Sequence, residues 1–333
     1  MEILAFGVTA DEKPLLEQAF AGEHEVRCLE VFMTEDTAPI AAGHEIVSCS
    51  VNADLNGRVL RILAAGGTKM IAQRSTGFNN IDLDVARELG MTVSRVSSYS
   101  PYSVAEFAWG LAMAVNRRIV RASNRTRDFD FRLNGLMGRD MRGRTVGVLG
   151  TGRIGEAFTR IAHGFGMNLL GWDVARNPAC VELGMQYVDK EELFASSDLI
   201  SLHVPLMDST HHVVDAAALR LMRDDAILVN SSRGGLVDTD ALVTELRAGR
   251  FAGVGLDVYE AEAGVFFLDK SLVAVEDDTL ARLVTFPHVV VTSHQAYYTS
   301  DAVGQIIDTT AANVADYLAS RRSENTLVPP PPP

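Results

Sequence analysis

The chain has 333 residues and a mass of 36.1 kDa, a length that predicts two domains. Hydrophobic residues make up 47% of it and charged residues 22%, which is typical of globular proteins and excludes a disordered or fibrous chain. With 30 Lys and Arg against 43 Asp and Glu, the net charge is −13. Such a chain lacks the basic surface that binding to nucleic acid or to an anionic membrane requires.

Targeting and covalent features favour a soluble, cytoplasmic protein. The N-terminal residues lack a basic segment followed by an apolar one, so no signal peptide is predicted, and no apolar stretch approaches a membrane span. The three cysteines, Cys28, Cys49 and Cys180, are too few and too scattered for a disulfide framework or a metal site. We therefore expect reduced, buried thiols and no bound metal.

Short apolar runs alternate with helical patterns along the first hundred residues, which predicts a parallel α/β unit. Its strands are expected at residues 2–8, 25–31, 45–50, 69–75 and 91–96. Asp82 is expected to cap a helix that ends at Gly90, a residue type that suits the position after a helix. A long helical stretch from about Pro101 to Arg127 follows, with proline in its first turn.

A second alternating set predicts a second α/β unit. Its strands are expected at residues 145–150, 168–173, 198–204, 226–232, 251–259 and 288–293. Asp189 with Glu192 forms a capping-box pattern at the start of one helix. Asp238 or Thr239 is expected to cap another helix, which ends before Gly249.

One long helix, predicted from Thr299 to Ser320, follows the last of these strands. Such a helix can pack back on the first unit, which would make that domain discontinuous. We therefore predict a substrate-binding domain of residues 1–100 and 297–333 and a dinucleotide-binding domain of residues 101–296. The prolines at 329–333 cannot donate backbone hydrogen bonds and are expected to be extended and mobile.

The segment from Gly150 to Gly155 carries the pattern Gly-x-Gly-x-x-Gly, with Arg153 and Ile154 before its last glycine. It directly follows an apolar strand and opens a helical pattern, which is the context of a dinucleotide-binding turn. Gly150 permits the tight turn, and Gly152 lets the backbone approach a pyrophosphate. Gly155 allows close packing of helix and strand.

Asp173 lies 23 residues after Gly150, at the end of the next strand. An acid there accepts hydrogen bonds from ribose hydroxyls and repels a 2′-phosphate, so NAD is favoured over NADP. Arg176, three residues further on, keeps NADP open as an alternative. A glycine turn in a protein that binds no nucleotide is disfavoured by the complete strand–turn–helix–strand–Asp context.

Three side chains that suit carbonyl chemistry follow strands of the second unit: Arg233, Glu262 and His294. Because the carboxyl ends of parallel strands share one edge of a sheet, we expect them to converge. An Arg can hold a carboxylate and polarise a neighbouring carbonyl, and a His exchanges a proton near neutral pH. A carboxylate beside the His fixes its tautomer and favours imidazolium. Singly, each could be an ordinary surface residue, and Glu260 competes with Glu262 for the acidic role.

Together these motifs resemble the D-2-hydroxyacid dehydrogenase family over roughly residues 1–328. The most specific segments are 74–82, 99–101, 104–106, 150–155, 230–235, 257–262 and 293–296. Residues 266–271 and 294–299 look most like the fermentative D-lactate dehydrogenases within that family.

The resemblance implies an α/β fold of two Rossmann- or flavodoxin-like parallel-sheet domains with an active-site cleft between them, assembled as a homodimer or homotetramer. It implies that Arg233, Glu262 and His294 are catalytic, which selects Glu262 over Glu260. The implied substrate contacts are Tyr99, Thr76, Gly77, Phe78 and Tyr298. The implied cofactor contacts, besides the glycine loop and Asp173, are Val104, Val204, Pro205, Asn230, Ser231 and Asp257.

The predicted reaction is the reversible, NAD-dependent reduction of pyruvate to D-lactate, with His294 as acid and base. A bulkier 2-oxo acid or glyoxylate is the alternative substrate. The alternative from a different class is a non-catalytic, NADH-sensing binding protein, because the same fold also serves as a corepressor scaffold.

Overall fold

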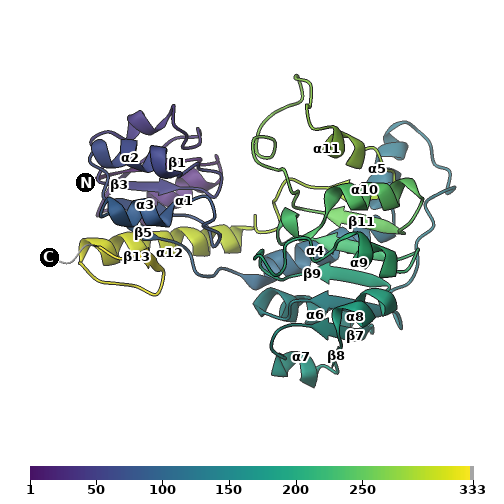
Figure 1. The fold of residues 1–333 in the computed structure, drawn as a ribbon. Coiled ribbons are helices and arrows are strands. Elements are labelled where there is room, and N and C mark those ends of the chain that lie inside the picture. The colour runs from purple at the N-terminus through teal and green to yellow at the C-terminus, as the bar shows by residue number, and fades with distance from the viewer. Residues whose placement is uncertain (331–333) are drawn as a thin grey trace. The chain divides into compact units, whose positions relative to one another are not determined.

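The structure is a computed structural model that describes residues 1–330. The chain forms two compact units: unit 1 contains Met1–Ser100 and the C-terminal segment from Thr299, and unit 2 contains Pro101–Tyr298. Each unit has helices packed around one mainly parallel sheet (Figure 1). The predicted fold class of two parallel-sheet α/β units is confirmed. Residues 331–333 of the predicted proline tail lie outside the described residues.

Unit 1 is built on a six-stranded sheet with the order β13-β5-β4-β3-β1-β2. Its strands are β1 (Glu2–Phe6), β2 (Glu25–Cys28), β3 (Ile46–Cys49), β4 (Met70–Gln73), β5 (Thr92–Ser94) and β13 (Thr326–Val328). The first five are parallel in the flavodoxin-like order 2-1-3-4-5. The sequence did not predict β13, a three-residue edge strand that pairs antiparallel with β5.

The helices of unit 1 are α1 (Glu12–Ala19), the 3₁₀ turn η1 (Ala38–Ala41), α2 (Gly57–Ala65), α3 (Leu83–Glu88) and α12 (Ser300–Leu318). Helix α3 has both of its predicted end signals. At the start of α3, Asp82 accepts a hydrogen bond from the N–H of Val85 at 3.0 Å. Gly90 follows α3 with a φ of 66°, a left-handed conformation that glycine adopts without strain.

Helix α12 belongs to unit 1 although it follows all of unit 2 in the chain. It packs against α1 and β4. Its buried Val303, Ile307 and Val314 share one hydrophobic cluster with Ile3 of β1 and Leu16 of α1. Burial of three such side chains contributes several kcal/mol, at about 1.5–3 kcal/mol each, and fixes the C-terminal segment on the first sheet.

Unit 2 is built on a seven-stranded parallel sheet with the order β12-β11-β10-β9-β6-β7-β8. Its strands are β6 (Thr145–Leu149), β7 (Asn168–Trp172), β8 (Gln186–Tyr187), β9 (Leu199–Leu202), β10 (Ile227–Asn230), β11 (Gly253–Leu256) and β12 (Val289–Val291). Strand β8, which has only two residues, was not predicted from the sequence. The strand order reverses between β6 and β9, the kind of position where Rossmann sheets bind dinucleotides.

The helices of unit 2 connect these strands. They are α4 (Pro101–Asn116), α5 (Ile119–Arg127), α6 (Arg153–Gly164), α7 (Pro178–Glu182), α8 (Lys190–Ser196), α9 (Ala216–Leu221), the 3₁₀ turn η2 (Gly234–Leu236), α10 (Thr239–Arg247) and α11 (Asp278–Leu283). Asp189 caps α8 and Asp238 caps α10 through their side chains, as predicted. No helix within residues 1–330 combines the length and the apolar character needed to cross a membrane.

The helical stretch predicted from Pro101 to Arg127 is helical but is divided into two helices, α4 and α5. Arg118 lies between α4 and α5 with a φ of 55°, which a right-handed helix cannot contain. Its guanidinium donates to the carbonyl of Val115 at 3.0 Å and so closes the end of α4. Much of α4 is buried whereas α5 has no buried residue, so the break occurs where contact with the core ends.

Candidate active site

The glycine loop joins β6 to α6 at the strand reversal of unit 2. Gly150 has a φ of 95°, and a Cβ there would lie 2.7 Å from the backbone of His203 and Val204. A Cβ on Gly155 would lie 1.9 Å from the carbonyl oxygen of Gly150. Neither position can therefore carry a side chain, because the loop, the helix and the neighbouring strand end touch through their backbones.

Gly152 differs from these two glycines, because a Cβ there would meet nothing within 4 Å. It is the N-cap of α6, and no side chain caps the helix. The space beside Gly152 is thus open at the positive end of the helix dipole of α6. This arrangement fits a dinucleotide pyrophosphate, and Arg153 and Ile154 lie in the first turn beside it.

Asp173 lies directly after β7 and is tied to the glycine loop. One of its carboxylate oxygens accepts a hydrogen bond from the N–H of Thr151 at 2.6 Å, and the other accepts from the N–H of Val174 at 2.7 Å. Thr151 in turn accepts from the hydroxyl of Tyr187 at 2.8 Å. The guanidinium of Arg176 lies over the ring of Tyr187, 5.9 Å from its centroid. The carboxylate is thus held where a ribose acid stands in a Rossmann fold.

The cofactor residues predicted at the ends of β9 and β10 lie at the same sheet edge. Asn230 ends β10, and Ser231 follows it with a buried hydroxyl that has no partner among the described residues. Such an orphaned donor fits a bound polar ligand. Val204 is buried after β9, with Pro205 exposed next to it, and Val104 is buried in α4.

The predicted catalytic residues follow three adjacent strands. In the sheet, β10 pairs with β11 and β11 with β12, so that Asn230 stands opposite Leu256 and Leu256 opposite Val291. Arg233 follows β10 by three residues, and His294 follows β12 by three residues. Glu262 lies in the loop after β11. All three therefore lie at the carboxyl edge of one sheet, as expected from the topology.

His294 and Glu262 are in direct contact. The imidazole Nδ1 lies 2.8 Å from Oε1 of Glu262, while Oε2 of Glu262 accepts a hydrogen bond from the N–H of Tyr259 at 3.1 Å. His294 has a φ of 56°, which is uncommon for a residue with a side chain. With Nδ1–H donating to the carboxylate, Nε2 is the ring nitrogen left for another partner. The ring of Phe267 lies 6.1 Å from that of His294, measured between centroids.

Asp257 at the end of β11 holds the His294 loop in this conformation. Its fully buried carboxylate accepts from the hydroxyl of Thr292 at 2.6 Å and from the N–H groups of Gln295 and Ala296 at 3.0 and 2.8 Å. Its carbonyl accepts from the N–H of His294 at 2.6 Å. Burial raises the pKa of Asp257, and the hydrogen bonds from this loop counteract part of that shift. Asp257 was predicted as a cofactor contact, whereas Thr292 belongs to no recognisable motif and was not predicted.

Arg233 has a different environment from the other two. Its guanidinium is half-buried and donates to the carbonyl of Ser232 at 2.7 Å. Asn230 donates to the carbonyl of Arg233 at 2.8 Å and so fixes the turn. A Cβ on the next residue, Gly234, would lie 2.1 Å from the carbonyl carbon of Tyr259, so this turn lies directly against the loop that carries Glu262. Within residues 1–330, no hydrogen bond joins Arg233 to His294 or Glu262.

The competing acid, Glu260, has another partner. Its Oε1 lies 2.5 Å from Nε2 of His212, a residue in the loop after β9. The two acids, which the sequence could not separate without the family resemblance, are thus paired with different histidines. Glu262 is the one that contacts His294.

The predicted substrate residues of unit 1 lie after β4. The carbonyls of Thr76, Gly77 and Phe78 accept hydrogen bonds from Arg95, Ser75 and Ile81, respectively. Within the part of the chain that the structure describes, nothing accepts a hydrogen bond from the N–H groups of these three residues. Three consecutive free N–H groups are typical of a site for an anion.

The two predicted tyrosines stand apart from that turn in the chain. Tyr99 lies half-buried just before α4. Tyr298 belongs to unit 2, is 37% exposed and packs edge-on against Tyr297.

Comparisons with known proteins identify the family of the chain. A family model described as "D-isomer specific 2-hydroxyacid dehydrogenase, NAD binding domain" matches residues 109–296. The D-lactate dehydrogenase of Escherichia coli K12 is 43% identical over 329 residues, which cover 98% of this chain and 100% of that protein.

Solved structures agree with the same assignment. The pyruvate reductase of Chlamydomonas reinhardtii superposes with a TM-score of 0.94 at 37% identity, over 98% of both chains. The D-lactate dehydrogenase of Aquifex aeolicus in complex with NAD and lactic acid gives 0.85 at 30% identity, over 99% of this chain and 100% of the other. This chain therefore belongs to the D-isomer specific 2-hydroxyacid dehydrogenase family and is an NAD-dependent oxidoreductase similar to D-lactate dehydrogenases.

Proposed function

We propose that the protein catalyses the reversible reduction of pyruvate to D-lactate with NADH. The observation that carries this proposal is the hydrogen bond between His294 and Glu262, 2.8 Å long, at the sheet edge that also carries the turn of Arg233. An imidazole, a carboxylate and a guanidinium supply proton transfer, control of the imidazole charge, and carboxylate binding. These are the groups that reduction of a 2-oxo acid requires.

His294 transfers the proton in this mechanism. Bound NADH supplies a hydride to the carbonyl carbon. The imidazolium of His294 gives the proton on Nε2 to the carbonyl oxygen as that oxygen becomes negative, and neutral His294 takes the proton back in the reverse reaction. Glu262 accepts the hydrogen bond from Nδ1–H and so keeps that proton on Nδ1. Its negative charge also stabilises the imidazolium.

Arg233 orients the substrate. Its planar guanidinium can donate to one oxygen of the substrate carboxylate and to the carbonyl oxygen, which polarises the bond that is reduced. In unit 1, the three N–H groups of Thr76, Gly77 and Phe78 suit a carboxylate. Tyr99 and Tyr298 are proposed as further substrate contacts. A D-lactate dehydrogenase and a pyruvate reductase among the similar proteins support pyruvate as the substrate.

A panel of 2-oxo acids tests the proposal. We expect purified protein to consume NADH fastest with pyruvate and more slowly with phenylpyruvate, 2-oxoisocaproate and glyoxylate. Loss of NADH absorbance is the measurement, and D-lactate is distinguished from L-lactate by chiral chromatography. A higher kcat/KM for one of the other acids would identify that acid, and not pyruvate, as the preferred substrate. NADH binding without turnover of any of them would instead indicate a cofactor-sensing protein.

Asp173 is proposed to select NADH over NADPH. Its carboxylate would repel the 2′-phosphate of NADPH, so Asp173→Ala is expected to raise kcat/KM for NADPH and lower it for NADH, each by about tenfold or more. Initial rates with both cofactors measure this shift. Arg176→Ala is the companion variant, because a loss of NADPH activity in it would identify Arg176 as a 2′-phosphate ligand. An unchanged NADH to NADPH ratio in Asp173→Ala would contradict the role of Asp173.

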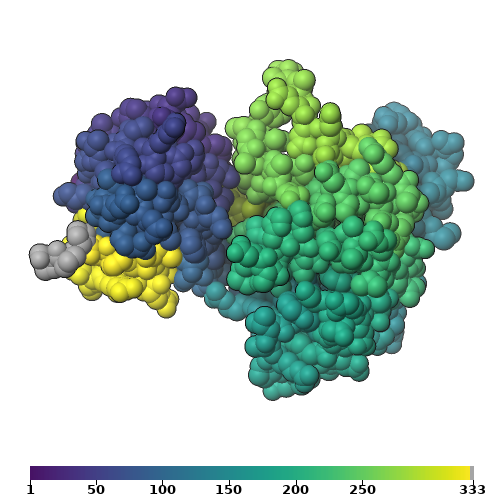
Figure 2. Space-filling view, in the orientation of Figure 1, coloured from purple at the N-terminus to yellow at the C-terminus, as the bar shows by residue number. Residues whose placement is uncertain are grey.

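We also propose a homo-oligomer that associates through the segment around α5. This segment lies at the margin of unit 2 (Figure 2), and it carries four large apolar side chains that are 70–91% exposed: Phe129, Phe131, Leu133 and Met137. Arg125 holds the segment in shape by donating to Asp130 and to the carbonyls of residues 132 and 134. An ordered apolar surface of this kind is typical of an interface between subunits.

Light scattering tests the oligomer. We expect a mass of at least twice 36.1 kDa for the protein and a lower mass for Phe131→Asp. A monomeric wild-type protein would contradict the proposal.

We also propose a cytoplasmic location. The use of NADH and the three free cysteines support it.

A further inference from the structure

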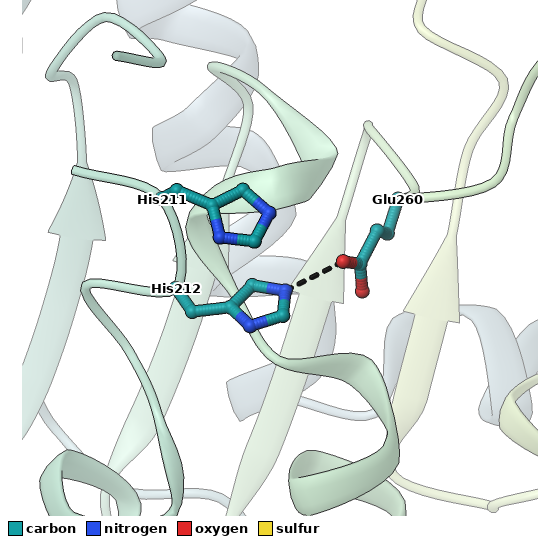
Figure 3. A group of neighbouring side chains, drawn as sticks. All are labelled: His211, His212 and Glu260. Carbon is teal, nitrogen blue, oxygen red and sulfur yellow. Dashed lines mark hydrogen bonds and ion pairs between the residues drawn. The ribbon is translucent and has the colours of Figure 1, made fainter. Parts of the chain in front are cut away.

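We propose that His211, His212 and Glu260 form a binding site for a divalent transition-metal ion, with Zn²⁺ the preferred one. These side chains lie side by side between the loops after β9 and β11 (Figure 3). One ligand atom from each lies within 4.8 Å of the other two. The site involves none of the proposed catalytic residues and does not depend on the proposed function.

The ligand atoms are close to the spacing that a metal ion requires. Nε2 of His212 lies 2.5 Å from Oε1 of Glu260, and the rings of His211 and His212 stack with centroids 3.9 Å apart. Zinc–ligand bonds of about 2.0–2.2 Å place tetrahedral ligand atoms roughly 3.3–3.6 Å apart. The His212–Glu260 pair therefore opens by about 1 Å as the ion enters, and the third ligand moves in by a similar amount.

The backbone around the ligands is fixed by neighbouring groups. The N–H of His211 donates to the carbonyl of Met207, and the N–H of His212 donates to the carbonyl of Gly235, both at 2.8 Å. Oε2 of Glu260 accepts from the hydroxyl of Thr239 at 3.2 Å, which orients the carboxylate and leaves Oε1 toward the histidines. Hydrogen bonds that orient ligands in this way are a usual part of protein metal sites.

The donor set selects the kind of ion. Two imidazoles and one carboxylate bind Zn²⁺ with the fourth position left to water, and the same set accepts Co²⁺, Ni²⁺ and Cu²⁺. Mg²⁺ prefers oxygen ligands in an octahedral arrangement and is not expected to bind. His211 and Glu260 are exposed and His212 is half-buried, so the ion reaches the site from solvent.

A bound ion would also fasten two loops of unit 2. His211 and His212 lie in the loop after β9, and Glu260 lies in the loop after β11, next to the turn that begins at Gly234. Without an ion, His211 and His212 stack on each other, and a hydrogen bond from His212 to Glu260 joins them to the other loop. Because the ion binds the folded protein and not the unfolded chain, we expect it to raise the thermal stability of the protein.

Calorimetric titration of the metal-free, tag-free full chain with Zn²⁺ tests the site. We expect wild-type protein to bind one more ion than either His211→Gln or Glu260→Gln, or to bind it at least about tenfold more tightly. His44→Gln is the matched control, because His44 pairs with Glu2 at 2.7 Å and has no third metal ligand near it among residues 1–330. That variant should bind Zn²⁺ as wild type does. Equal binding by wild type, His211→Gln and Glu260→Gln, or no binding by wild type, would overturn the proposal.

Co²⁺ and thermal unfolding give independent readouts. Co²⁺ should produce visible absorption of a four- or five-coordinate site in wild type, and this absorption should be absent in both ligand variants. Zn²⁺ should raise the Tm of wild type by several degrees and that of the ligand variants by less, whereas Mg²⁺ should leave all of them unchanged. An equal shift for all three proteins with Zn²⁺ would show that the His212–Glu260 pair is only a structural contact.

Discussion

Replacing His294 by Asn is expected to lower kcat for pyruvate reduction by about 100- to 10,000-fold, the usual contribution of a general acid. Asn retains a polar group that can donate to Glu262, but it cannot supply a proton. Because no cofactor contact is assigned to His294, the affinity for NADH should stay within a factor of about two. Steady-state rates and fluorescence titration with NADH measure the two effects separately.

Two further measurements decide whether His294 acts as the acid. His163→Asn is the matched control, because His163 lies exposed in α6, and its kcat should equal that of wild type. In wild type, reduction needs the imidazolium and oxidation needs the neutral ring, so rising pH should slow pyruvate reduction and speed lactate oxidation. In His294→Asn this opposite dependence should vanish. The same pH profile in both directions for wild type, or a kcat near the wild-type value in the variant, would remove His294 from proton transfer.

The sequence predicted the strands that position the site because parallel strands leave strong signals. Short apolar runs with turns at both ends are buried on both faces, as β9, β10 and β11 are. The elements it missed, β8 and β13, have two and three residues, too few to form a hydrophobic pattern. The break at Arg118 was also missed, because its cause is the end of core contact and not a proline or a glycine.

The site itself was only partly predictable, because its contacts depend on side-chain direction. Glu260 and Glu262 stand two positions apart in a loop with no regular period, so no sequence pattern assigns one of them to His294. In the structure, Glu262 reaches His294 and Glu260 reaches His212. The φ of 56° at His294 and the buried bonds from its loop to Asp257 are equally invisible in the sequence.

Asp257 connects the fold to the chemistry proposed for this edge. The two oxygens of its carboxylate accept three hydrogen bonds from residues 292–296, and desolvation raises its pKa. A buried acid with three donors stabilises one loop conformation strongly, at about 1.5–3 kcal/mol for a bond to a charged group. The position of the His294 ring therefore depends on Asp257 at the end of β11, in addition to its bond with Glu262.

Arg233→Lys is expected to lower kcat/KM for pyruvate by about 100- to 1,000-fold, although the positive charge is kept. Lysine has no planar fork, so it cannot donate to the substrate carboxylate and to the carbonyl oxygen together. The turn itself should persist, because Asn230 holds it through the carbonyl of Arg233 and not through the side chain. Steady-state kinetics with pyruvate measure the loss, and an unchanged Tm and NADH affinity establish that the fold is intact.

The control for this substitution is Arg247→Lys, an exposed position in the last turn of α10 where the same change should have no effect on kcat/KM. Addition of guanidinium ion to Arg233→Ala should restore part of the lost rate, because the small cation can occupy the space that the side chain leaves. Rescue by guanidinium but not by ammonium would identify the planar fork, and not charge alone, as the required feature. Kinetics of Arg233→Lys equal to those of wild type would exclude Arg233 from contact with the substrate.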